Sequence, residues 1–112
     1  IKSISRIDSK PGTFRARHSH KNDGHFIEVL VGEVYLYERP INSDECPKLT
    51  VVKEGDIAFT EPLVDHEMTF KNFTVFNCYS LLPRTSENYE NETVRFDYSL
   101  EDIYNSYPYR NG

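Results

Sequence analysis

The histidines are the residues of this sequence whose spacing most clearly points to chemistry. Three of the four, His18, His20 and His25, lie within eight residues, and the fourth is His66. On an extended strand His18 and His20 point to the same side, so both imidazoles can reach one ion. His25 follows the polar turn KNDG and can face them from the next strand of a hairpin, with His66 approaching from a neighbouring strand. Such a cluster is typical of a transition-metal site.

The segments that must position these histidines alternate in the manner of β-strands. From residue 14 to residue 20 the even-numbered residues, which include His18 and His20, share one predicted face. Arg15 and Arg17 lie on the other face, which we assign to the surface or to a subunit interface. Further runs rich in Val, Ile, Tyr and Phe, separated by turn residues, extend to about residue 82. Repeated short strands favour an antiparallel sandwich or barrel, and the lack of long amphipathic helical patterns excludes a doubly wound α/β fold.

Composition restricts the class of protein and its partners. The 112 residues suffice for one domain, with the 28% charged and 38% hydrophobic content of an ordinary globular protein. The net charge of −5 argues against nucleic acid, because phosphate binding needs a basic surface. No apolar run of about 18 residues is present, so we expect no membrane-spanning segment. Cys46 and Cys78 are too few for a disulfide framework and indicate free thiols in a reducing compartment, the cytoplasm.

The spacing of the first three histidines resembles the first sequence motif of the cupin superfamily, G-x5-H-x-H-x3-4-E-x6-G. Gly12, His18, His20 and Gly32 stand at the matching positions of this motif. His25 stands where the family usually has glutamate.

The second cupin motif, G-x5-P-x-G-x2-H-x3-N, is matched less completely. Gly55 and His66 have the right spacing. Glu61, Leu63 and Phe70 stand at the positions of the family's Pro, Gly and Asn.

This resemblance implies an all-β cupin fold, a double-stranded β-helix of jelly-roll type, in a single domain over residues 1–112. We expect the barrel at about residues 14–82 and a polar C-terminal arm at residues 83–112, in which Ser99 caps a short helix. The arm packs either on the barrel or on a second subunit. Small cupins commonly pair, so we predict a homodimer in which the arm or the N-terminal segment covers the partner's sheet.

The resemblance also implies that His18, His20, His25 and His66 bind one divalent transition metal ion: Fe, Ni, Cu, Co, Mn or Zn. Four neutral imidazoles leave the ion its full charge, which makes it a stronger Lewis acid than an ion bound by glutamate. Glu28 has the opposite strand parity from His25, so we expect it to point out of the barrel.

Three hypotheses for the function remain open at this point. The first is a metal-dependent enzyme acting on a small organic molecule, as a dioxygenase or as a Lewis-acid isomerase or lyase, with Met68, Phe70 and Tyr79 lining the pocket. The second is a sugar-nucleotide ketoisomerase of polysaccharide synthesis, because the runs RHSHK and HEMTF resemble metal-free cupins that use acid–base catalysis. The third is a non-enzymatic cupin that binds a small molecule. We find no Ser-His-Asp or Cys-His arrangement and no glycine-rich phosphate loop in the sequence.

Overall fold

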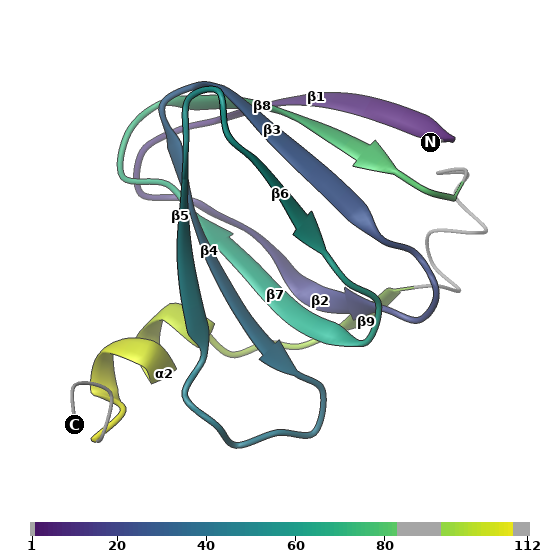
Figure 1. Cartoon of the computed structure of the whole chain (residues 1–112). Helices are drawn as coiled ribbons and strands as arrows, with labels where there is room; N and C mark the ends of the chain where they lie inside the picture. Colours follow the sequence, from purple (N-terminus) through teal and green to yellow (C-terminus); the bar gives the residue numbers. More distant parts are fainter. Residues whose placement is uncertain (1, 83–92, 109–112) are drawn as a thin grey trace.

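The chain folds into two antiparallel β-sheets that face each other (Figure 1). The computed structural model describes residues 2–82 and 93–108. The four-stranded sheet contains, in order, β1 (Ser3–Ser9), β8 (Thr74–Ser80), β3 (His25–Val31) and β6 (Ile57–Thr60). The five-stranded sheet contains, in order, β5 (Lys48–Lys53), β4 (Glu33–Pro40), β7 (Val64–Thr69), β2 (Phe14–His20) and β9 (Thr93–Arg95). The all-β class predicted from the alternating pattern is confirmed.

The chain changes from one sheet to the other at Gly32, between β3 and β4. Gly32 has a φ of +80°, and a Cβ at this position would lie 2.5 Å from the carbonyl oxygen of Phe73. Only glycine fits such a left-handed, tightly packed link.

The strand β1 precedes the barrel start predicted near residue 14. It pairs with β8 along its whole length, from Ser3↔Ser80 to Ser9↔Thr74. Its sequence SISRIDS contributes only Ile7 to the surroundings of the core, while Ile4 is 66% exposed. An edge strand with so few apolar residues shows little hydrophobic alternation, so its sequence does not predict a strand before residue 14.

The apolar core and the histidines lie side by side in the space between the sheets. The buried core contains Ile27, Val29, Val34, Leu36, Val52, Phe70, Phe76 and Cys78. On β3 the buried positions run Val29, Ile27 and then His25. On this strand the inward face therefore passes from apolar residues to histidine, so His25 lies next to the apolar core.

The described part of the C-terminal arm joins the five-stranded sheet of its own chain, with β9 as an edge strand and the helix on the outer face (Figure 1). The strand β9 pairs with β2, and the helix α2 (Leu100–Ser106) contacts β7 and β4. Ser99 caps α2 as predicted, because its side chain accepts a hydrogen bond from the backbone N–H of Asp102. The first part of the predicted arm, residues 83–92, lies outside the described residues.

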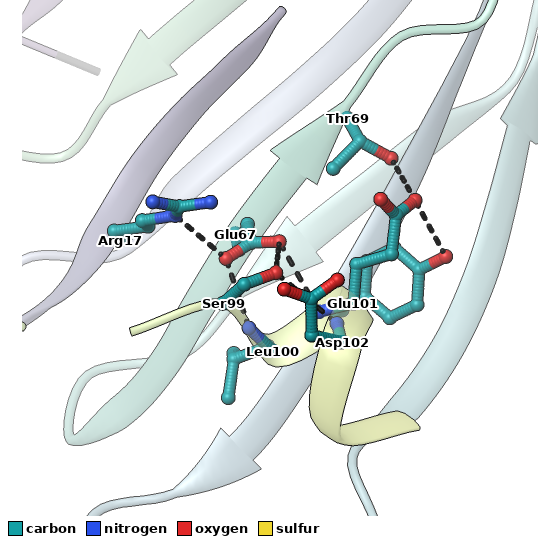
Figure 2. A network of polar contacts seen from close by, with 8 residues as sticks. Arg17, Glu67, Thr69, Ser99, Leu100, Glu101 and Asp102 are labelled. Carbon is teal, nitrogen blue, oxygen red and sulfur yellow. Dashed lines mark hydrogen bonds and ion pairs between the residues drawn. The ribbon is translucent and has the colours of Figure 1, made fainter. Parts of the chain in front are cut away.

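Glu67 on β7 fixes this docking through a buried polar network, which Figure 2 shows. Its carboxylate is 0% exposed and accepts hydrogen bonds from the backbone N–H groups of Leu100, at 3.0 Å, and Glu101, at 3.2 Å. Arg17 on β2 donates to the same carboxylate at 3.0 Å. The Glu67 carboxylate therefore supplies acceptors for two backbone N–H groups in the first turn of α2, which have no acceptor within the helix.

The outer face of the four-stranded sheet carries exposed apolar side chains instead. Ile4 is 66% exposed, Ile57 61% and Phe59 38%. Among the described residues no helix is long and apolar enough to cross a membrane.

Candidate metal centre

Three histidines meet between the two sheets, next to the apolar core. His18 and His20 come from β2, and His66 comes from β7, which pairs with β2 at His18↔His66. The side-chain nitrogens that these residues offer all lie within 4.8 Å of one another. The ring centroid of His18 is 4.5 Å from that of His20 and 4.7 Å from that of His66. Nitrogens bound to one ion at about 2.1 Å are roughly 3–3.5 Å apart, so small side-chain rotations suffice for all three to bind it.

A β-bulge in β2 directs His18 and His20 inward. The pairing of β2 with β7 shifts register between Ala16 and His18. Ala16 has a φ of +73° and Arg17 a φ of +61°, in the left-handed region that side chains other than glycine rarely adopt. The bulge inserts one residue, so positions before and after it change face.

This bulge corrects the prediction for Arg15. Uniform alternation placed Arg15 away from the histidines, but it pairs with Met68 and lines the same cavity as His18 and His66. Its guanidinium donates to the Ser9 hydroxyl at 2.7 Å and to a backbone carbonyl of β1 at 3.0 Å. Arg17 lies on the outer face as predicted, where it pairs with Glu67.

Burial keeps the imidazoles of His18 and His66 neutral. His66 is 3% exposed, and its burial lowers its pKa to about 3, with a backbone hydrogen bond opposing and the neighbouring histidines adding to the shift. Burial, with His66 and His20 nearby, lowers the pKa of the partly buried His18 to about 2. The Nδ1 atom of His66 lies 3.3 Å from the Val64 carbonyl oxygen. Donation to that carbonyl leaves the Nε2 lone pair free to bind an ion.

His25 stands beside these three residues, but its nitrogens face other partners. Its ring stacks on His20 with the centroids 4.3 Å apart. Its Nε2 lies 2.8 Å from a carboxylate oxygen of Asp23, and its Nδ1 lies 3.4 Å from the sulfur of Cys78. The group of converging nitrogens contains His18, His20 and His66 but not His25. Three of the four predicted ligands are therefore brought together.

The contact between His25 and Cys78 corrects our expectation that the chain has no Cys-His arrangement. The two residues are 53 positions apart, and strand pairing joins them, because β3 and β8 run antiparallel with Ile27↔Cys78 and His25↔Ser80 in register. Cys78 and His25 lie diagonally across the inner face of these strands. The apolar run around Cys78 is enough to predict a strand there. It does not show which residues of β3 lie opposite it, so the contact with His25 could not be predicted.

A cavity of about 120 Å³ lies among these side chains. It is lined by His18, His25, His66, Cys78, Arg15, Met68 and several apolar residues of both sheets. At about 30 Å³ per water molecule, it has room for roughly four. The cavity can therefore hold the reacting end of a ligand but not a large molecule.

Of the three predicted pocket residues, Met68, Phe70 and Tyr79, only Met68 lines the cavity. Phe70 instead belongs to the core, where its ring stacks on Phe76 with centroids 5.8 Å apart. Tyr79 lies on the outer face of the four-stranded sheet, and its hydroxyl donates to Glu28 at 2.6 Å. Strand parity explains the position of Tyr79, because it adjoins the inward-facing Cys78 and must face the other way. Glu28 points outward as predicted.

Comparison with known proteins supports the fold. No protein family and no curated protein matches the sequence. Among solved structures the chain resembles QdtA, a sugar 3,4-ketoisomerase from Thermoanaerobacterium thermosaccharolyticum in complex with TDP, with a TM-score of 0.71 and 19% identity over 99% of this chain and 76% of QdtA. It also resembles a 3,4-ketoisomerase from Helicobacter canadensis, with a TM-score of 0.72 and 19% identity over 94% of this chain and 74% of that enzyme.

A third solved structure is the capsular polysaccharide assembling protein CapF from Staphylococcus aureus. The TM-score is 0.76 at 17% identity, and the match covers 87% of this chain. The chain spans less than a third of CapF, since the match covers 29% of that protein. These likenesses confirm the cupin fold predicted from the motif spacing. At sequence identities of 17–19%, the likeness shows a shared fold but does not show a shared activity.

Proposed function

We propose that this chain is a cupin enzyme that isomerises a keto sugar nucleotide, with His18, His20 and His66 at its reactive centre. The reaction class is supported by the alignment with two ketoisomerases, which extends over 94% and 99% of this chain. The dioxygenase-like reaction that the sequence suggested first has no counterpart among the three neighbours named above. Because one fold hosts many chemistries, the proposal depends further on what the site can do.

The observation that carries the proposal is the convergence of three imidazole nitrogens within 4.8 Å. With pKa values of about 2 and about 3, His18 and His66 are weak bases at neutral pH. The same low values favour metal binding, because few protons compete for the nitrogen lone pairs. We therefore assign His18, His20 and His66 as ligands of one divalent transition ion. Bound there, the ion would polarise the substrate's carbonyl group and acidify the adjacent C–H bond.

The size of the cavity sets the orientation of the substrate. A space of about 120 Å³ accepts the keto edge of a sugar, whereas the nucleotide must remain outside. The exposed Arg15 lines this cavity, and its guanidinium is held by Ser9. A fixed guanidinium at the rim favours the phosphate groups of such a substrate.

A second candidate is a metal-free ketoisomerase, in which histidines move the proton by acid–base catalysis. The likeness to QdtA supports both candidates, and what favours this one is the resemblance of the runs RHSHK and HEMTF to metal-free cupins. The two candidates share the substrate class and differ in whether activity needs a metal.

One experiment separates these candidates. The protein is purified without chelator, its metal content is measured by mass spectrometry, and a 4-keto sugar nucleotide is incubated with it in D2O. We expect about one ion per chain, together with deuterium incorporation beside the carbonyl that chelation abolishes and metal restores. Incorporation that survives complete metal removal would favour the metal-free candidate. Binding without any incorporation would contradict both and favour a non-enzymatic binding protein.

We also propose that the chain forms a homodimer through the outer face of its four-stranded sheet. The exposed Ile4, Ile57 and Phe59 on that face favour association with an apolar surface. Light scattering at micromolar concentration tests this, and Ile57→Glu should shift a dimer to a monomer. A monomer mass for the unmodified protein would contradict it.

A further inference from the structure

We propose that Cys78 is a reactive thiol that captures a small α,β-unsaturated carbonyl compound entering the histidine cavity. The proposal depends on the arrangement of Cys78, His25 and Asp23, and it is independent of the isomerase activity and of the metal ligands proposed above.

Asp23 is the anchor of this arrangement. One of its carboxylate oxygens accepts hydrogen bonds from the backbone N–H groups of Leu81 and Leu82, both at 3.0 Å. The other oxygen lies 2.8 Å from Nε2 of His25. The carboxylate is thereby fixed from the end of β8, and it holds the imidazole in one orientation.

His25 connects this carboxylate to the thiol. With its Nε2 proton directed to Asp23, its Nδ1 lone pair faces the sulfur of Cys78 at 3.4 Å. Asp23, His25 and Cys78 are only 6%, 7% and 5% exposed, so bulk water competes little with these contacts. The hydroxyl of Ser80 lies 3.4 Å from Nε2, on the Asp23 side of the ring. A thiol, an imidazole and a carboxylate in this order match the arrangement that activates cysteine nucleophiles.

The covalent step uses only groups at this site and the ligand. The sulfur of Cys78 forms a bond to the β-carbon of the ligand as the thiol proton passes to Nδ1 of His25. The carbon–carbon double bond becomes a single bond, and the α-carbon takes up the proton from His25. The product is a thioether, with no leaving group and no change in the oxidation state of the protein.

Access to Cys78 runs through the cavity of about 120 Å³ that it lines together with the exposed Arg15. The whole of a compound as small as acrylamide fits this volume, whereas N-phenylmaleimide can insert only its maleimide ring and must leave its phenyl group outside. Cys46 provides an internal comparison, because it is partly exposed in the loop between β4 and β5 and its thiol contacts the Pro47 carbonyl at 3.5 Å.

The test measures acrylamide addition to each cysteine of the purified full chain at neutral pH, by time-resolved peptide mass spectrometry. We expect Cys78 to react at least about ten-fold faster than Cys46, since a positioned base contributes about 10²–10⁴-fold to such steps. His25→Gln and Asp23→Asn should each lower the Cys78 rate about ten-fold or more and leave the Cys46 rate unchanged. Glu28→Gln, on the outer face of the same strand as His25, is the matched control and should change neither rate.

A rate for Cys78 equal to or below that of Cys46 in the unmodified protein would overturn the proposal. An unchanged Cys78 rate in folded His25→Gln and Asp23→Asn proteins would overturn it too. If these variants do not fold, the unmodified protein still decides the question through reagent size. The ratio of the Cys78 rate to the Cys46 rate should then be higher for acrylamide than for N-phenylmaleimide, and an equal ratio for the two reagents would refute a cavity thiol.

Discussion

His66 and His25 reach the same cavity from opposite sheets, and they differ in what their second nitrogen contacts. His66 on β7 faces the uncharged carbonyl of Val64, whereas His25 on β3 faces the carboxylate of Asp23 and the thiol of Cys78. The first arrangement suits the proposed metal site, because it leaves a neutral imidazole whose other nitrogen would bind the ion. The second presents an imidazole that can accept a proton and share its charge with a carboxylate. We therefore infer that the partners of each histidine, rather than its place in a motif, set its role.

Removing His66 should have the largest effect on the metal centre. His66→Ala takes away the only proposed ligand that β7 supplies, leaving two ligands on β2. We expect a loss of zinc or cobalt affinity greater than the roughly 10- to 100-fold that loss of a ligand's hydrogen-bond partner causes. Isothermal titration of the chelator-treated protein measures this, and unchanged affinity would exclude His66 as a ligand.

The metal-free protein should lose stability as the pH falls. His18 and His66 have folded-state pKa values of about 2 and about 3, whereas unfolded histidine titrates near 6.5. Below pH 6.5 the unfolded chain thus binds more protons, so the free energy of unfolding decreases from pH 6.5 towards pH 3. The slope is at most about 1.4 kcal/mol per pH unit for each histidine.

Urea denaturation at pH 7.5 and 5.0, with chelator present, measures this difference. In His66→Gln the free energy of unfolding should depend less on pH, because one histidine with a lowered pKa has been removed. Stability that is constant or rises between pH 7.5 and pH 5.0 would show that these imidazoles are not held neutral.

Removing His25 should affect the metal centre far less than removing His66. His25→Ala deletes a ring that stacks on His20, so we expect affinity to change by less than about ten-fold, or about 1.4 kcal/mol. The same titration provides the measurement. A loss as large as that of His66→Ala would erase the distinction between the two histidines.

The smallest predicted effect tests the bulge that precedes His18. Ala16 has a φ of +73°, which costs a residue with a Cβ roughly 1–2 kcal/mol. Ala16→Gly should raise the free energy of unfolding by up to about 1 kcal/mol, because glycine's larger unfolded-state entropy offsets part of the gain. Thermal denaturation checks this, with metal affinity expected to stay unchanged. A destabilised Ala16→Gly protein would argue against the bulge.

Alternation and motif spacing were enough to predict the fold class and the meeting of His18, His20 and His66, because both depend on strand periodicity. The face of Arg15 was mispredicted because a bulge inserts one residue without a sequence signal. The contact between Cys78 and His25 depends on the register of β8 against β3, which neither segment specifies alone. Tyr79, in contrast, was predictable, since it adjoins Cys78 and must face the other way.

X-ray absorption spectroscopy of the cobalt-loaded protein tests the central claim most directly, because it counts the imidazoles bound to the ion. We predict the three imidazoles of His18, His20 and His66 in the unmodified protein. The spectrum of His25→Ala should be the same, and that of His66→Ala should show one imidazole fewer. A fourth imidazole that disappears in His25→Ala, or an ion that binds no imidazole, would contradict the account.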